Sequence, residues 1–143
     1  MRSPGSIWQS QRTLSRWSMR VLVAESDLDL RIRLCFWLEQ IESAELAGLA
    51  RNRAELLPAM RVSNADVIVV NFDLVAVGFE DVLAALQALR PVPKTIVIGW
   101  QQELGVTLRN RGVDAFIYGP DLPDALCETM GNIFTINPTP CRE

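Results

Sequence analysis

The side chains of this chain that could take part in binding or catalysis are polar residues placed at the ends of apolar runs. Glu25 and Ser26 follow one short apolar run, and Asn71 and Asp73 follow another. Carboxylates of this kind hold magnesium in proteins, usually together with phosphate oxygens and waters. The chain contains no histidine, which removes the commonest general base and the commonest transition-metal ligand. The chemistry therefore depends on whether the fold brings these groups together.

The apolar run at 67–70 is the clearest indication of a strand, because unbroken β-branched residues are typical of parallel strands covered on both faces. Apolar runs predict four further strands, at 21–24, 45–50, 95–99 and 115–118. Apolar residues at helical spacing predict five helices. The first is capped by Asp27 and buries Leu30, Leu34, Trp37, Leu38 and Ile41; the others cover about 52–60, 82–89, 104–112 and 122–134.

Strands that alternate with helices predict an α/β fold with helices on both faces of a parallel sheet. For a domain of this length we expect the flavodoxin-like, doubly wound five-stranded sheet in the order 2-1-3-4-5. Its switch point lies between strands 1 and 3, where ligands bind. Glu25 and Ser26 then face Asn71 across a crevice, with Gly99 and Gly119 at the neighbouring strand ends.

The charge, the apolar runs and the cysteines of the chain exclude some classes of partner and of location. Residues 1–18 hold three arginines and no acid, so eleven of the fourteen basic residues and all seventeen acidic ones lie in the remainder. A body this acidic is unsuited to nucleic acid. No apolar run is long enough to predict a membrane span. Three scattered cysteines, Cys35, Cys127 and Cys141, form no CxxC pair and fit a reducing cytoplasm.

Three segments are expected. Residues 1–18, rich in Ser, Gln and Arg, predict a disordered extension, with two alternatives: a targeting peptide or amphipathic arm, or a true start at Met19. Residues 19–136 form the domain. Residues 137–143, with two prolines, form a frayed tail.

Three motifs in the correct order resemble the receiver domain of the bacterial response-regulator family. Residues 20–31 resemble its opening strand and acidic pair, and residues 66–71 resemble the strand that ends in the phosphorylated aspartate. Residues 112–120 resemble its Gly-Ala-x-x-Tyr-x-x-Lys-Pro segment. The resemblance covers about Arg20 to Phe134 and implies a module of two-component (phosphorelay) signalling.

The chain departs from the family at four of its five chemical positions. Asn71 replaces the phosphoacceptor, Ser26 the second acid, Gly99 the switch hydroxyl and Gly119 the lysine. Phosphoryl transfer depends on positioning and electrostatics, which these changes remove. We therefore expect no phosphorylation, weak or no magnesium binding at Glu25, no cofactor and no enzymatic activity.

Three residues near the predicted crevice allow more than one interpretation. Asp73, two residues beyond Asn71, would share its side of a longer strand and could replace the acceptor. Trp100 either plugs the crevice or is a half-exposed loop aromatic. Phe116 falls where receivers keep a mobile aromatic, and without a hydroxyl at Gly99 we expect plain packing.

The leading hypothesis is a stand-alone pseudo-receiver that binds a protein partner, with no DNA-binding domain after it. Receivers signal through helix 4, strand 5 and helix 5, which implies as contacts Leu108, Arg109, Arg111, Phe116, Tyr118 and Asp121. On the first helix, Ile32, Cys35 and Phe36 lie outside the buried stripe and predict either a second contact surface, such as a homodimer, or intramolecular burial. The alternative function is a small-molecule binder, in which glycines make room for a ligand beside Ser26, Asn71 and Trp100.

Overall fold

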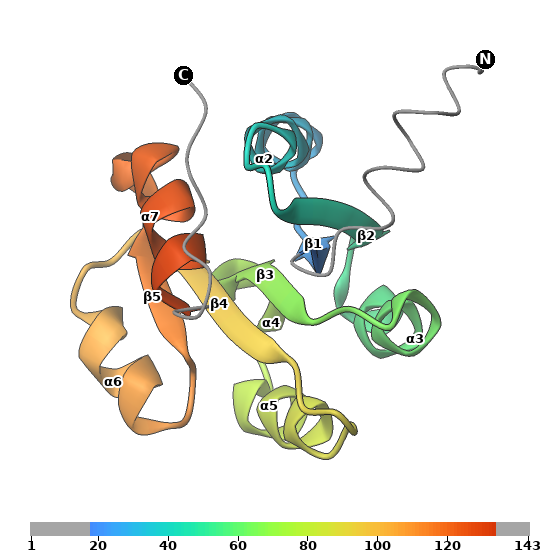
Figure 1. Cartoon of the computed structure of the whole chain (residues 1–143). Coiled ribbons are helices and arrows are strands. Elements are labelled where there is room, and N and C mark those ends of the chain that lie inside the picture. Colours follow the sequence, from blue (N-terminus) through green and yellow to red (C-terminus); the bar gives the residue numbers. More distant parts are fainter. Residues whose placement is uncertain (1–17, 134–143) are drawn as a thin grey trace.

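The computed structural model describes residues 18–133 as a parallel five-stranded sheet in the order β2-β1-β3-β4-β5 (Figure 1). The strands are β1 (Met19–Ala24), β2 (Ala44–Ala50), β3 (Val67–Asn71), β4 (Lys94–Gly99) and β5 (Ala115–Tyr118). This confirms the predicted flavodoxin-like order. The switch point lies between β1 and β3, because the chain turns to β2 on one side and to β4 on the other.

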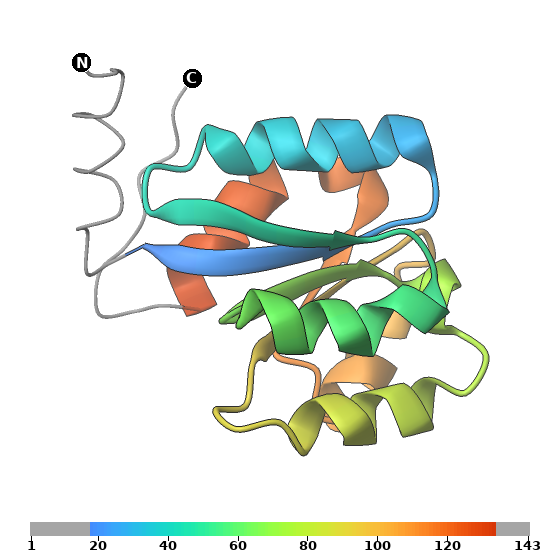
Figure 2. The ribbon, with the colours of Figure 1, turned by 90° about the vertical axis from the view of Figure 1, so that its right-hand side faces the viewer.

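Helices cover both faces of the sheet (Figures 1 and 2). One face carries α2 (Leu28–Glu39) and α7 (Asp124–Ile133). The other face carries α3 (Arg53–Ser63), α4 (Phe72–Val75), α5 (Phe79–Gln87) and α6 (Leu104–Asn110). A short 3₁₀ turn, η1 (Gly119–Asp121), links β5 to α7.

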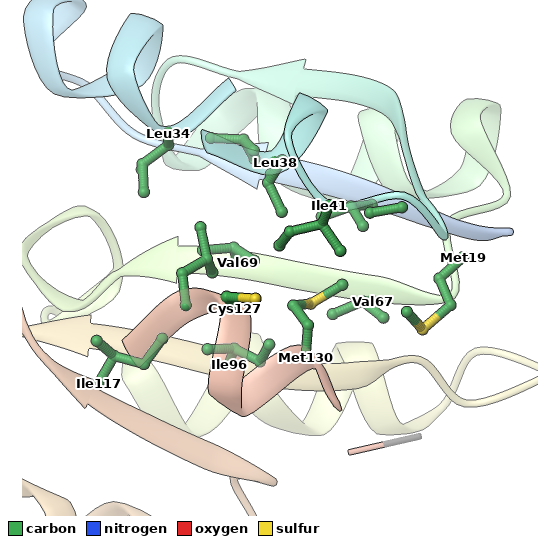
Figure 3. Close-up of a cluster of buried hydrophobic side chains, with 14 of the residues drawn as sticks. Met19, Leu34, Leu38, Ile41, Val67, Val69, Ile96, Ile117, Cys127 and Met130 are labelled. Carbon is green, nitrogen blue, oxygen red and sulfur yellow. The ribbon is translucent and has the colours of Figure 1, made fainter. Parts of the chain in front are cut away.

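Alternation along the strands divides the core into two layers. Val67, Val69 and Ile96 point to the layer beneath α2 and α7, where Leu34, Leu38 and Met130 pack against them (Figure 3). Ile68, Val70 and Val97 point to the opposite layer, beneath α3, α5 and α6. Every side chain of β3 is buried, as its β-branched run predicted.

The first predicted helix and its cap are confirmed, although Leu30 and Trp37 of the predicted buried stripe are only partly buried. Asp27 caps α2 by accepting from the Leu30 backbone N–H at 2.9 Å, and Leu34, Leu38 and Ile41 are buried. Asn52 caps α3 in the same way, through the Glu55 N–H at 3.0 Å. Pro58 does not end α3, which continues to Ser63 because Leu56 and Met60 anchor it to the sheet.

One helix was missed and several predicted boundaries were wrong. The short helix α4 was not predicted, because Asn71 is both the last strand residue and the N-cap of that helix. The helix α5 begins at Phe79, and Leu89 lies beyond its end at Gln87. Leu122 precedes α7, which begins at Asp124. Gly112 follows α6 at a φ of 103°, as expected of a residue just past a helix end.

The predicted N-terminal extension, the C-terminal tail and Cys141 lie wholly or almost wholly outside the described residues. Within residues 18–133, no helix combines the length and apolar character needed to cross a bilayer.

Candidate functional site

A buried carboxylate and a buried amide meet at the switch point. Ala24 of β1 pairs with Val70 of β3, so the next residues on each strand, Glu25 and Asn71, leave the sheet side by side. Glu25 is 1% exposed and Asn71 is 6% exposed. The Asn71 Nδ2 donates to Glu25 Oε1 at 2.7 Å. The predicted convergence of these two residues is therefore confirmed.

Both ends of the Asn71 amide are used. Its Nδ2 donates to Glu25, and its Oδ1 accepts from the Asp73 backbone N–H at 3.0 Å, which caps α4. An aspartate in this position could accept from Asp73 but could not donate to Glu25 while ionised. The amide is therefore the side chain that satisfies both neighbours, which gives a structural reason for asparagine at the acceptor position.

Asp73 does not share a strand with Asn71. The chain turns into α4 directly after Asn71, so the alternation assumed for Asp73 ends one residue too early. The Asp73 side chain is exposed, and the contact of this residue with the site is its backbone N–H bond to Asn71. The geometric basis for Asp73 as a replacement acceptor was therefore wrong.

The turn after β1 is held by its own groups. The Asp27 backbone N–H donates to Glu25 Oε2 at 3.0 Å, so both carboxylate oxygens of Glu25 have protein donors. The Arg31 guanidinium donates to the backbone carbonyl of Glu25 at 2.8 Å and to that of Ser26 at 3.4 Å. Ser26 itself is exposed. Sequence reasoning missed Arg31, although its place one turn into α2 is where a side chain can reach back to the preceding loop.

These contacts do not fit the magnesium ion that the fold family implies. Magnesium requires free oxygen ligands in near-octahedral geometry. Here one Glu25 oxygen accepts from an amide and the other from a backbone N–H, and Ser26 supplies no charge. Among residues 18–133, no three acidic, histidine or cysteine side chains converge as a metal cluster. The amide hydrogen of Asn71 stabilises the Glu25 carboxylate by a hydrogen bond, at the oxygen where a cation would otherwise bind.

Trp100 lies over Gly119. A Cβ atom on Gly119 would overlap the six-membered ring of the Trp100 indole, and Gly119 is buried beneath it. The indole remains 46% exposed on its other side. The space in which a lysine side chain would begin at position 119 is therefore filled by the indole. The contact with Gly119 fits the plug alternative for Trp100, and the exposure of the indole fits the half-exposed alternative as well.

Phe116 lies over Gly99 in a comparable way. A Cβ on Gly99 would be 2.8 Å from Phe116 Cε1, and a Cβ on Gly105 would be 3.0 Å from Phe116 Cδ2. The ring thus fills the space that a side chain at position 99 would take. Two glycines were expected to leave an empty crevice for a small molecule. That premise was wrong, because the chain's own aromatic rings occupy both spaces.

The surface of α6, β5 and α7 contains part of the predicted partner contacts. Leu108 is 2% exposed and belongs to the core, so its assignment as a contact was wrong. Arg111 is ion-paired with Glu80, and Asp121 is exposed. The remaining candidates lie in or beside β5. Tyr118, the last residue of β5, is half-buried, while Phe116 of β5 and Arg109 of α6 line a groove of about 420 Å³.

The helix α2 carries an exposed apolar stripe. Leu28, Ile32 and Phe36 are 60%, 59% and 57% exposed and recur every fourth residue, so they form one row on the outside of the helix. Burial raises the pKa of the Cys35 thiol, and Glu39 adds to the effect while Arg31 opposes it. Cys35 packs against the core and is not part of the row. The sequence had indicated Ile32 and Phe36 but not Leu28, which the same four-residue spacing identifies.

The fold matches solved receiver domains, although no protein-family model and no curated protein matches the sequence. The response regulatory domain of MrkE from Klebsiella pneumoniae aligns at a TM-score of 0.71 and 14% identity, over 82% of this chain and 97% of that one. A chain in the structure of the CheA3 P1 domain in complex with CheY6 from R. sphaeroides aligns at 0.70 and 16%, over 82% and 97%.

RcsB from Salmonella enterica serovar Typhimurium, bound to promoter rprA in the presence of phosphomimetic BeF₃⁻, aligns at a TM-score of 0.71 and 13% identity. The alignment covers 82% of this chain but 61% of RcsB, so this chain spans about three fifths of that protein. Identities this low establish a shared fold. The resemblance to receiver domains inferred from three short motifs is confirmed at that level.

Proposed function

We propose that this chain is a pseudo-receiver: a receiver-like module of bacterial two-component signalling that acts in the cytoplasm through protein contacts and without phosphoryl transfer. The observation that carries the proposal is the 2.7 Å bond from Asn71 Nδ2 to Glu25 Oε1. It puts a neutral amide where a nucleophilic carboxylate would be and occupies an oxygen that a cation would need.

The two aromatic rings support the same proposal. Phosphoryl transfer is assisted by preorganised positive charge and hydrogen-bond donors close to the transferred group. At positions 99 and 119 this chain has glycines whose outer space is filled by Phe116 and Trp100. In this geometry no side chain at position 99 or 119 can contact a phosphoryl group and so start the rearrangement on which a phosphate-dependent switch relies. The fold is then left to act as a rigid surface for a partner.

Incubation with acetyl phosphate and magnesium should leave the intact mass of the protein unchanged. The physical reason is the absence of a carboxylate acceptor at position 71 and of a cation at position 119. Intact-mass spectrometry within minutes of mixing detects an acyl phosphate before it hydrolyses. An adduct mapped to any carboxylate of residues 18–133 would refute the proposal. An adduct on Asp73 would mean that the protein is a conventional, phosphorylated receiver.

The apolar row of Leu28, Ile32 and Phe36 supports contact with a protein. An exposed row of large apolar side chains on one helix is a common mark of a binding surface. A similar fold occurs in the structure of the CheA3 P1 domain in complex with CheY6, and RcsB is known bound to promoter DNA. The excess of acidic residues in this chain favours a protein over nucleic acid.

Replacing Ile32 with aspartate should abolish association through α2 without unfolding the domain. Because Ile32 is 59% exposed, the free energy of unfolding should change by less than about 0.5 kcal/mol. Sedimentation velocity reports self-association, and co-purification reports a partner. Val62→Asp on α3, which is 87% exposed and lies outside both the row and the surface of α6, β5 and α7, is the control. If both variants retain every association of the parent chain, α2 is not the interface.

A further inference from the structure

A groove lies beside the closed pocket, between α2 and the segment that joins β5 to α7. Its volume is about 430 Å³, and its walls include Leu30, Trp37, Trp100 and Leu122. The two sides of the Trp100 indole therefore have different surroundings. One side of its indole covers Gly119, and the part that is exposed adjoins the groove. Two indoles on one small groove are a surface suited to flat or cationic groups.

The rim of this groove is acidic. Asp27 and Asp29 line it directly, and Asp121 and Asp124 flank Leu122 in the chain and are exposed. The loops after β3 and β4 end at the same edge of the sheet and add Asp73 and Glu103, both exposed. None of the connections at 25–27, 72–78, 100–103 or 119–123 contains a lysine or arginine.

The nearby arginines cancel only part of this charge. Arg33 lines the groove and neutralises Asp29, with which it is ion-paired at 3.1 Å, while Arg31 keeps its positive charge and donates to backbone carbonyls. The other carboxylates named above still outnumber the arginines. After β2, Arg51 is paired with Glu55, and Arg53 donates to the Val77 carbonyl. The edge as a whole therefore attracts positive charge, and attraction of this kind accelerates and orients the encounter with a partner.

We infer that the groove binds an arginine or lysine side chain from an extended segment of a partner protein. The cationic head would lie against the indoles of Trp37 and Trp100, which line the groove. The exposed carboxylates of Asp121 and Asp124, close to Leu122 in the chain, would complement its charge. This inference rests on the proposed function and specifies the chemistry of the partner. A neutral ligand would leave the acidic rim unused, and a second copy of this acidic edge would be repelled.

The test uses two short probes, an acetylated and amidated Gly-Arg-Gly-Arg-Gly peptide and the same peptide with citrulline, which is neutral and nearly isosteric. Each is titrated into the ¹⁵N-labelled full chain while the indole N–H signals are followed by NMR. The arginine peptide should shift the Trp37 and Trp100 signals saturably. The citrulline peptide should bind at least about tenfold more weakly, because it loses both the cation–π contact and the charge attraction.

Variants separate the groove from the general charge of the molecule. Trp100→Ala should weaken the arginine peptide about tenfold, and the double variant Asp121→Asn with Asp124→Asn should weaken it severalfold without disturbing the core, because both are exposed. Val106→Ala, exposed on α6, should change nothing. The inference would be overturned if the citrulline peptide bound as tightly as the arginine peptide, or if the double variant bound the arginine peptide as the parent chain does. It would also be overturned if the peptide shifted signals scattered over the whole surface, or if the Trp37 and Trp100 signals shifted without peptide as the protein concentration rose. Each of these outcomes leaves the acetyl phosphate result, and hence the proposed function, untouched.

Discussion

Replacing Asn71 with aspartate is expected to lower the free energy of unfolding by about 3 kcal/mol near pH 7. The variant puts a second carboxylate where an amide donates to Glu25 at 2.7 Å, in a site that is almost fully buried. It therefore replaces a charge-assisted hydrogen bond by repulsion between like charges. The loss should shrink as the pH falls, because one shared proton then restores a hydrogen bond between the two carboxyls. Urea unfolding at several pH values measures both effects.

The matched control exchanges the two groups. In the double variant Glu25→Gln with Asn71→Asp, an amide on β1 faces a carboxylate on β3, so the hydrogen bond can form in the opposite direction. The exchange should recover at least half of the lost stability, which a double-mutant cycle reports as a strong coupling between the two positions. Independent, additive losses would show that the bond between Asn71 and Glu25 does not hold the site together.

Replacing Gly119 with alanine is the second change with a large expected effect. The added methyl group would overlap the Trp100 indole, so the indole must move or the backbone must shift. Overpacking of this kind costs about 1–3 kcal/mol. Gly119 is not among the residues with positive φ, so the cost would come from the contact and not from backbone strain. Urea unfolding measures the loss, and a red shift of tryptophan fluorescence would report the displaced indole.

The same substitution tests whether contact with Trp100 causes the loss of stability in Gly119→Ala. In a Trp100→Ala background the methyl group has space, so Gly119→Ala should become close to neutral there. Gly99→Ala serves as a parallel case on the other side of the sheet, because its methyl group would contact Phe116 at 2.8 Å. An equal loss from Gly119→Ala in both backgrounds would mean that the indole does not occupy the site in solution.

The sequence was sufficient for the fold and for the meeting of Glu25 with Asn71. Unbroken apolar runs identify parallel strands, and parallel strands bring their last residues to one edge. Once strands 1 and 3 are neighbours, Glu25 and Asn71 must be close. That prediction depends only on backbone order, which periodicity encodes well.

The filling of the pocket could not be predicted in the same way. Periodicity does not indicate that the Trp100 ring folds over Gly119 or that the Phe116 ring folds over Gly99, because a loop residue has no fixed side and a rotamer depends on its neighbours. The alternative function therefore interpreted the glycines as empty space, while a plug by Trp100 remained one of two possibilities. Asp73 failed for a related reason, because asparagine ends a strand as readily as it caps a helix.

The most direct measurement of the central claim is the backbone amide NMR spectrum of the chain with magnesium and beryllofluoride, the phosphomimetic present in the RcsB structure. The amides of Glu25, Ser26, Asn71, Gly99 and Gly119 surround the place where a phosphoryl group would bind. With the Glu25 oxygens taken by protein donors and the strand-end glycines covered by rings, we predict no saturable shift in these signals. A saturable shift centred on them would show that the pocket still accepts a phosphoryl-like ion, and would contradict the account.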